Sequence, residues 1–467
     1  MQAMCSFGPV KGFETNGMEC FLGIPYGKAE RFQPPKPCDP WEEEKDCTHF
    51  GKFAIETDEK ENEWQIHSED CLNLNVFTPS CQGKYPVVVN LHGGAFQNGA
   101  ADRTAPFSRD VVFVDVNYRL GVWGFLQMPG LPSSGNNGLL DQILALHWVK
   151  NEIAAFGGDP QRITVMGLSA GAKSVGALLA APGARDTFSQ AILSSGATQS
   201  IRSVRTAESV AREFFRFAGC EQDPDALLTM QATDLLKAQR AMCMGRNSTC
   251  LFGPVADGVV IPENWDDSLF SGHGWKGRLL IGSNRREMME DGNPDPASMA
   301  EDLYGDNAVW AKKAVEEECA GRHLEKDQER LLWLDVHSDF MYRLHADRLA
   351  EKMSVFCPVW SYSFEFAPAT HAYDHTVLFG DETNLEPLKQ ADFDKMHERL
   401  CGMYESFLYG ETPAGPDIPA WPLCRAPEFY KMRLNTVCQA QPCPQGDSRR
   451  NFPDCVLVRE QEGREKA

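Results

Sequence analysis

Short, nearly continuous runs of apolar residues recur along the chain and alternate with longer amphipathic stretches. Residues 85–91, 111–116, 163–166 and 191–193 are runs of this kind. Apolar runs of this length, rich in valine and isoleucine, are typical of strands that are buried on both faces. Residues 139–156 instead place apolar side chains at helical spacing. The alternation predicts an α/β fold with a mostly parallel sheet that has helices on both faces.

The remaining periodic segments extend this pattern over most of the chain. Further strands are expected at 21–27, 68–79, 279–282, 360–366 and 428–434, and further helices at 207–240, 298–350 and 392–409. Polar and apolar residues alternate in 68–79, which predicts a half-buried strand, and the residues before 21–27 predict an N-terminal β-hairpin. We expect one domain over residues 1–436, followed by a polar tail with cysteines and prolines over residues 437–467.

The composition is that of a globular protein and argues against two classes of function. Apolar residues make up 42% of the 467 residues, and the net charge is −21. Nucleic-acid binding is not expected, because phosphates attract a basic surface. No stretch approaches the ~18–20 consecutive apolar residues of a membrane helix. The first residues lack the features of a secretory signal, so we expect a cytoplasmic protein. The 16 cysteines include no paired C-x-x-C zinc pattern.

A G-x-S-x-G pattern at residues 167–171 lies between the strand 163–166 and an alanine- and leucine-rich helix at 172–180. Glycines on both sides of the serine permit a turn that is too tight for a Cβ atom. Ser169 at its apex would have a strained backbone and an exposed hydroxyl beside a helix N-terminus. This arrangement is a nucleophile elbow. The alternative is an ordinary turn that ends a strand.

A serine nucleophile needs N–H donors for the oxyanion that develops on the substrate. The segment His92-Gly93-Gly94-Ala95 follows a buried strand N-terminal to the elbow, where an HGGG-type oxyanion motif belongs. Together with Ala170, the residue after the serine, Gly94 and Ala95 would supply three donors. The alternative for this segment is a simple glycine turn.

The chain resembles the type-B carboxylesterases, the cholinesterase-like branch of the α/β hydrolases. The similar segments lie in family order from about residue 6 to residue 434: FLGIPYG, SEDCLNLNVFTP, HGGAF, NYRLGVWGFL, GNNGLLDQILALHWVKNEIAAFGGDP, GLSAG, PVADG, HAYDHTVLFG and PAWP. The resemblance implies an α/β-hydrolase fold, with a central, mostly parallel mixed sheet. It also implies two-step acyl transfer on a small-molecule ester, with no metal or organic cofactor.

The resemblance also implies the catalytic residues, in the chain order serine, acid, histidine. Ser169 occupies the serine position. The histidine loop of the family is similar to H-G-x-E-L-x-Y-V-F-G and here is HAYDHTVLFG, so His371 takes the catalytic place, with Ala372 instead of the glycine. His375 lies nearby but falls where the family has an apolar residue.

The acid position departs further from the family pattern. The pattern G-x-N-x-D-E-G stands here as Gly-Ser-Asn-Arg-Arg-Glu-Met at residues 282–288, which identifies Glu287 by position. Glu290 and Asp291 are alternatives for this role. Glu287 could also be an ordinary surface glutamate.

Two departures bear on the substrate. Cholinesterases have a glutamate before the serine, and Leu168 stands there in this chain. Trp64 lies only loosely where cholinesterases have their choline-binding tryptophan. A choline ester is therefore not the expected substrate, and we expect a serine carboxylesterase that acts on small, largely apolar or neutral carboxylic esters. A related amidase, lactonase or thioesterase is one alternative. A non-catalytic cholinesterase-like interaction protein is another, although such proteins typically lose the serine or the histidine.

The resemblance bears on the cysteines as well. Secreted members of the family often pair the cysteine of the EDCL segment with one upstream, and start a second bridge at an A-G-C segment. The usual partners of Cys71 and Cys220 are missing here, and Cys38 and Cys47 are the alternatives for the first. Disulfides do not persist in a reducing compartment. Our hypothesis is that Cys71 and Cys220 are free thiols.

Overall fold

Three of the predicted buried strands lie side by side as β9 (Tyr85–Leu91), β10 (Val112–Val116) and β11 (Gly158–Leu168). β9 lies between the other two strands and pairs with both in parallel. Every residue of β10 is buried, and so is every residue of β9 after Tyr85. The prediction of parallel strands buried on both faces is confirmed here.

The structure is a computed structural model that describes residues 1–58, 66–131, 133–244, 251–288, 295–322, 324–381 and 387–443. The chain forms two compact units. The first contains Met1–Ile192 and Ser200–Gly277, and the second contains Leu193–Gln199 and Arg278–Ala467. Three side chains considered above, Trp64, Glu290 and Asp291, lie outside the described residues.

Antiparallel strands extend the sheet of the first unit beyond β10. β8 (Asn73–Thr78) pairs with β10, β4 (Met18–Pro25) pairs with β8, and β3 (Phe13–Thr15) pairs with β4. The shorter strands of this unit are β1 (Gln2–Cys5), β2 (Gly8–Lys11), β5 (Gly27–Lys28), β6 (Lys36–Pro37), β7 (Lys45–Asp46), β13 (Arg202–Ser203) and β14 (Val255–Ala256). β1 and β2 pair as an antiparallel hairpin, as expected for the N-terminus.

The prediction that 68–79 forms a half-buried strand is wrong, because all six residues of β8 are buried. Its polar positions are filled by asparagines whose side chains bond the backbone instead of water. Oδ1 of Asn75 accepts the N–H of Gly23 at 2.8 Å, and its Nδ2 donates to the carbonyl oxygen of Ala101 at 2.7 Å. Polar residues can alternate in a buried strand when every polar group has a partner.

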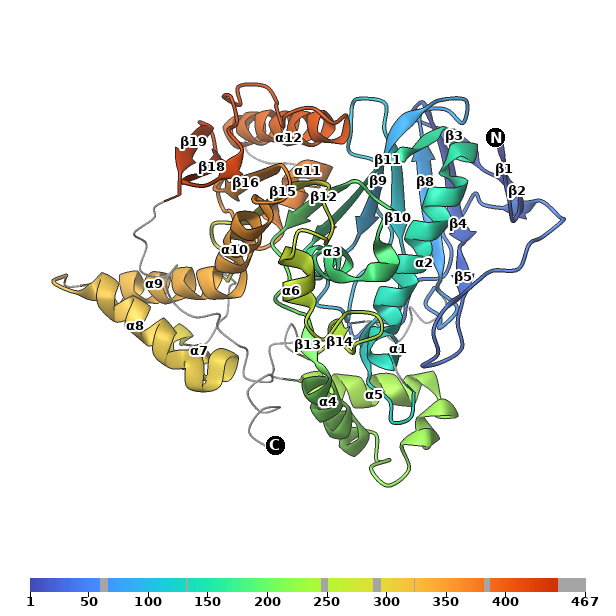
Figure 1. Ribbon diagram of the computed structural model, residues 1–467, viewed down its shortest axis with the longest axis horizontal. Helices are drawn as coiled ribbons and strands as arrows, with labels where there is room; N and C mark the ends of the chain where they lie inside the picture. The colour runs from blue at the N-terminus through green and yellow to red at the C-terminus, as the bar shows by residue number, and fades with distance from the viewer. Residues whose placement is uncertain are drawn as a thin grey trace. The chain divides into compact units, whose positions relative to one another are not determined.

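Helix α3 (Ala170–Ala180) packs against β11 and β9, and α2 (Asn137–Glu152) also contacts β11 (Figure 1). All 11 residues of α3 are buried. Most of them are small, which permits close packing of the helix on the sheet. The other helices of the first unit are α1 (Gly121–Phe125), α4 (Val204–Phe217), α5 (Ala232–Cys243) and α6 (Trp265–Phe270). β12 (Gln190–Ser194) crosses the boundary between the units.

A buried ion pair holds the loop after β10 to α2. Nη2 of Arg119 lies 2.7 Å from Oδ1 of Asp141, and Nε lies 2.8 Å from Oδ2. The backbone N–H of Arg119 donates to the same Oδ2 at 3.0 Å. The two side chains are 4% and 0% exposed. Both charges are therefore compensated within the core, which a buried ion pair requires.

The second unit has its own parallel strands, β15 (Arg278–Asn284), β16 (Val359–Phe364) and β18 (Glu428–Leu434). β16 pairs with β15 and with β18. β17 (Cys424–Arg425) and β19 (Gln439–Pro442) are antiparallel to β18. The strand expected at 428–434 is confirmed, and β19 follows it within the segment expected to be a polar tail.

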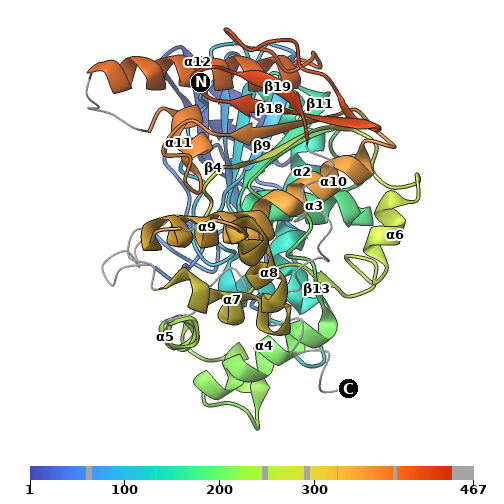
Figure 2. The same cartoon turned by 90° about the vertical axis from the view of Figure 1, so that its left-hand side faces the viewer.

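The helical stretch predicted at 298–350 is divided into α7 (Pro296–Tyr304), α8 (Ala308–Cys319), α9 (Lys326–Ser338), the π-helical turn η7 (Asp339–Arg343) and α10 (Leu344–Met353). Gly305, with φ 52°, and Gly321, with φ 74°, lie just after α7 and α8, because helices commonly end at left-handed glycines. α7, α8 and α9 lie together around their own apolar core (Figure 2). α10 packs against β15 and β16.

Two helices follow β16. The helix predicted at 392–409 is α12 (Pro387–Leu408), which begins earlier than expected. Where the sequence predicts only a loop, α11 (Tyr373–Phe379) forms directly after residue 371. Its seven residues are too few for a recognisable apolar period, which explains why the pattern did not reveal it.

Cys71 and Cys220 are both free thiols, as the hypothesis on the cysteines expects. Cys71 is 1% exposed, and burial raises the pKa of its thiol well above the usual range. Burial also raises the pKa of Cys220. Within the described ranges, no helix combines the length and the apolar character that a membrane crossing requires.

Candidate active site

Ser169 stands at the apex of the turn between β11 and α3, with φ 54° and ψ −117°. A positive φ is strained for a residue that has a side chain. The flanking glycines have no room for one. A Cβ on Gly167 would lie 2.3 Å from the carbonyl carbon of Gly171, and a Cβ on Gly171 would lie 1.9 Å from the oxygen of Leu91. The predicted tight turn between a strand and a helix is confirmed.

The loop after β9 lies beside Ser169 in the first unit. A Cβ on Gly93 would lie only 3.4 Å from the Cβ of Ser169. The loop folds back on itself, because the carbonyl oxygen of Gly94 accepts the N–H groups of Gln97 and Asn98, both at 2.9 Å. The structure therefore brings the two glycine-containing motifs of the sequence together.

Three backbone N–H groups at these motifs have no acceptor in the part of the chain that the structure describes: those of Gly94, Ala95 and Ala170. Gly94 and Ala95 have φ 108° and 56°, a turn conformation in which successive amides form an anion-binding concavity. Ala170 begins α3, so its N–H has no intrahelical partner. Unsatisfied amides of this kind stabilise a developing oxyanion.

His92 supports this loop from the protein interior. Its ring stacks on Tyr118 with centroids 4.4 Å apart, and its Nδ1 donates to the oxygen of Gly93 at 2.9 Å. Nε2 is buried and has no partner among the described residues. Burial lowers the pKa of His92 to about 4. The imidazole is therefore neutral at neutral pH and serves as a structural group.

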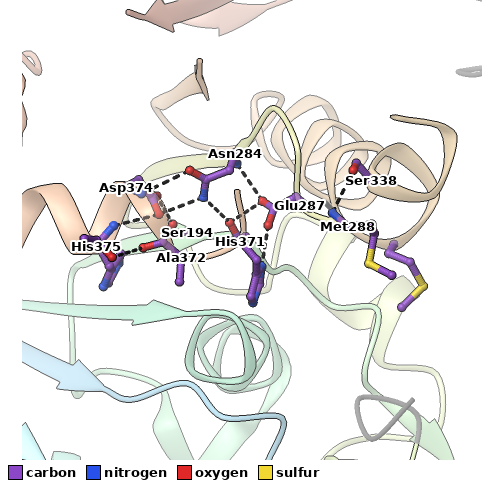
Figure 3. A network of polar contacts seen from close by, with 12 residues as sticks. Ser194, Asn284, Glu287, Met288, Ser338, His371, Ala372, Asp374 and His375 are labelled. Atoms are coloured by element: carbon purple, nitrogen blue, oxygen red, sulfur yellow. Dashed lines mark hydrogen bonds and ion pairs between the residues drawn. The ribbon is translucent and has the colours of Figure 1, made fainter. Parts of the chain in front are cut away.

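In the second unit, Glu287 and His371 form a hydrogen-bonded pair (Figure 3). Nδ1 of His371 donates to Oε2 of Glu287 at 2.5 Å. The side chain of Glu287 is fully buried, whereas 24% of the His371 side chain is exposed. Oε1 of Glu287 accepts the N–H of Asn284 at 2.7 Å and the hydroxyl of Ser195 at 2.5 Å. A carboxylate held at both oxygens orients the imidazole and leaves Nε2 for other chemistry.

The residue after His371 is Ala372, where the family pattern has a glycine. Ala372 has φ 68° and ψ 0°, the left-handed conformation that a glycine adopts most easily. The alanine therefore retains the glycine-like backbone at some cost in strain. His375 lies on α11, where its backbone N–H donates to Asp374 at 3.0 Å.

The structure thus brings Ser169 and the three amides together in the first unit, and Glu287 and His371 together in the second. Sequence reasoning missed the groups that support the second pair: Ser195 and Asn284, which donate to Glu287; Asp374, which accepts from Asn284; and Tyr342, whose ring centroid lies 4.9 Å from that of His371. Asn284 was visible in the G-x-N segment of the acid motif, and Asp374 in the histidine motif. No sequence signal identified Ser195 or Tyr342 as neighbours of these side chains.

Comparisons with known proteins identify the family. The sequence profile described as the carboxylesterase family matches residues 2–446. A para-nitrobenzyl esterase of Bacillus subtilis (strain 168) is 32% identical, over 96% of this chain and 97% of the relative. A liver carboxylesterase of Sus scrofa is 27% identical, over 89% of this chain and 85% of the relative.

Solved structures of similar proteins cover almost the whole chain. A PNB esterase superposes with a TM-score of 0.81 and 30% identity, over 96% of this chain and 99% of that chain. The Geobacillus stearothermophilus carboxylesterase EST55 superposes with a TM-score of 0.83 and 28% identity, over 97% and 100%. The fold is that of the α/β hydrolases. The chain belongs to the carboxylesterase family and is a carboxylic ester hydrolase.

Proposed function

We propose that this esterase uses Ser169 as its nucleophile, His371 as its general base and Glu287 as the acid that orients the histidine. The observation that carries the proposal is the 2.5 Å hydrogen bond between His371 Nδ1 and the buried carboxylate of Glu287. It leaves Nε2 of the imidazole to accept a proton. The strained, glycine-flanked backbone of Ser169 supports its role as the nucleophile.

The proposed reaction has two steps through an acyl-enzyme. The Ser169 oxygen attacks the ester carbonyl while His371 accepts the serine proton, and the proton then passes to the departing alcohol. In the second step His371 accepts a proton from water and the hydroxide attacks the acyl carbon; the bond from that carbon to the Ser169 oxygen then breaks, His371 returns the proton to this oxygen, and the acid leaves. The N–H groups of Gly94, Ala95 and Ala170 are assigned to the oxyanion of both steps.

We assign a small, largely apolar or neutral carboxylic ester as the substrate. Leu168 precedes the serine, so this position offers no carboxylate to a cationic alcohol group. The proposed catalytic domain is the whole of residues 1–436, since the assigned residues are distributed along the sequence from Gly94 to His371. No role is assigned to residues 437–467.

The test is hydrolysis of p-nitrophenyl acetate, butyrate and octanoate by the purified protein and by Ser169→Ala. We expect turnover by the wild type, loss of turnover in the variant, and labelling of Ser169 by a fluorophosphonate. Turnover that survives in Ser169→Ala would reject Ser169 as the nucleophile. A matched panel of amides, lactones and thioesters identifies the preferred leaving group, because the same triad serves all four substrate classes.

A further inference from the structure

A second buried carboxylate, that of Asp374, lies in the same polar network as Glu287 (Figure 3). Asp374 is 2% exposed and accepts four hydrogen bonds. Oδ1 accepts from Nδ2 of Asn284 at 2.9 Å and from the N–H of His375 at 3.0 Å. Oδ2 accepts from the hydroxyls of Tyr362, at 3.2 Å, and Ser194.

This environment fits a charged carboxylate. An ionised carboxylate only accepts hydrogen bonds, and all four partners of Asp374 donate. Within the described part of the chain it has no ion pair with a lysine or an arginine. A buried charge is tolerated only when hydrogen bonds replace its hydration. The chain thus surrounds one carboxylate with four donors, which needs an explanation beyond packing.

Asn284 connects this carboxylate to the acid of the proposed triad. Its side chain exchanges two hydrogen bonds with Asp374, because Nδ2 donates to the carboxylate at 2.9 Å and Oδ1 accepts the backbone N–H at 3.2 Å. The backbone N–H of Asn284 donates to Oε1 of Glu287 at 2.7 Å. One residue at the end of β15 therefore bonds both carboxylates.

The segment 369–374, which contains the catalytic histidine, is held at both ends. At its start, the N–H of Arg286 donates to the oxygen of Ala369 at 2.9 Å. At its end, the two hydrogen bonds between Asn284 and Asp374 attach it to the strand that precedes the acid. The imidazole–carboxylate pair lies between these attachments. Between the two attachments, Ala372 has a left-handed backbone, which is strained for a residue with a side chain.

We propose that Asp374, acting through Asn284, is a positioning residue that keeps His371 on Glu287 and adds a second negative charge to the surroundings of the imidazole. The inference rests on the proposed function, since it assigns His371 as the base. Its consequence is that the imidazolium formed during each step is stabilised by two carboxylates, one in direct contact and one through the Asn284 amide.

Other titratable groups in this network are Glu287, His371, His375, Tyr362 and Tyr404. Burial, together with the charge of Asp374, raises the pKa of both tyrosines well above the usual range. Neither phenol therefore titrates in the range of an esterase assay. The acid limb of the pH–rate profile then reports the imidazole that serves as the base.

The decisive variant is Asp374→Asn, which keeps the size of the side chain and removes its charge. We expect kcat on p-nitrophenyl butyrate to fall about 10- to 100-fold with KM changed less than about twofold, because a misplaced base affects the chemical step. We also expect the acid limb of kcat/KM to move to lower pH by about half a unit or more, because removal of a negative charge makes the imidazolium less stable.

Two matched variants separate positioning from folding. Tyr362→Phe removes one donor to the same carboxylate but keeps the charge, and it should lower kcat less than about threefold. Asp374→Glu restores the charge with the residue that the family pattern carries at this position, and it should recover the acid limb of the wild type. The proposal is overturned by a folded Asp374→Asn protein with wild-type kcat and acid limb, or by equal losses in Tyr362→Phe and Asp374→Asn.

A readout that does not need turnover distinguishes this proposal from the proposed function. The Nδ1 proton of His371 and the titration of its ring nitrogens can be followed by NMR in the wild type and in Asp374→Asn. We expect the variant to lose the downfield Nδ1 proton and to titrate at lower pH. If the wild type hydrolyses no ester, the proposed function fails, but the NMR titration still tests the position of His371. Identical titrations in the two proteins would reject the role of Asp374.

Discussion

The ring of Tyr342 lies against the imidazole of His371, with centroids 4.9 Å apart and planes inclined by 43°. Tyr342 belongs to the π-helical turn η7. Such turns are rare in proteins, and those that occur are often at functional sites. The turn is held by an ion pair between Arg343 and Asp339 at 2.5 Å and by a hydrogen bond from Gln199 to the oxygen of Met341 at 3.3 Å. The irregular turn therefore presents an aromatic face to the histidine.

Tyr342→Leu should lower kcat about 3- to 30-fold, because it removes an aromatic face that orients the imidazole and favours its charged form by ~0.5–2 kcal/mol. Tyr342→Phe keeps the ring and should stay within about twofold of the wild type. Steady-state kinetics with p-nitrophenyl acetate measure both. Equal losses in the two variants would assign the effect to the hydroxyl instead of the ring.

Gly94→Ala should lower kcat by roughly 100- to 1,000-fold with little change in KM, because a displaced oxyanion donor costs ~2.7–4 kcal/mol of transition-state stabilisation. The added Cβ would lie 2.0 Å from the oxygen of Asn98, so the loop must move. Gly17→Ala is the matched control, since Gly17 has φ 74° and nothing within 4 Å of its Cβ position. The control should lose some stability and keep its activity. An active Gly94→Ala enzyme would remove this amide from the oxyanion site.

The buried imidazole of His92 should make stability fall in acid. Its pKa is about 4 in the folded protein, below the 6.5 of a free histidine, so the unfolded chain binds the proton first as pH falls. The contribution of the neutral His92 imidazole to the free energy of unfolding is complete above about pH 6.5 and is lost as pH falls toward about 4. This contribution amounts to roughly 3 kcal/mol. Urea unfolding across this range should show a weaker pH dependence in His92→Gln. An unchanged dependence in the variant would mean that other groups cause it.

Asp141→Leu should destabilise the protein by ~3–5 kcal/mol, because it leaves the guanidinium of Arg119 buried without its partner. The double variant Arg119→Met/Asp141→Leu should lose less than the single variant, since no unpaired charge remains. Asp39→Asn breaks the exposed ion pair with Lys28 and should change stability by less than ~1 kcal/mol. Denaturant unfolding of the three variants measures these differences. A single variant that is no worse than the double one would contradict the argument.

The sequence predicted the central strands and the elbow because each has a strong local signal. β9 and β10 are continuous apolar runs, and the tight turn at Ser169 has no room for a Cβ at either flanking glycine. β8 was misjudged because alternation shows polarity, and polarity is compatible with burial when asparagines bond the backbone. A local pattern does not reveal the partner that satisfies a polar group.

The same limit applies to the candidate site. Glu287 and His371 were identified by their positions in motifs, and the structure brings them within 2.5 Å of each other. The side chain of Asn284 donates to Asp374 across 90 residues of sequence and to the hydroxyl of Ser195 across 89. The contact of Tyr342 with His371 depends on one π-helical turn, and the apolar spacing of the sequence does not predict such a turn.

The two partners of the hydrogen bond from Ser195 to Glu287 are synthesised at different times. Ser195 belongs to a seven-residue segment of the second unit, Leu193–Gln199, that lies within the sequence of the first. Its acceptor is 92 residues further along the chain, which a ribosome needs roughly 5 to 20 seconds to add. During that time the nascent chain has completed Ser169 but has neither the acid nor the base. The proposed nucleophile therefore stays without its proton acceptor until about half of the second unit has been made.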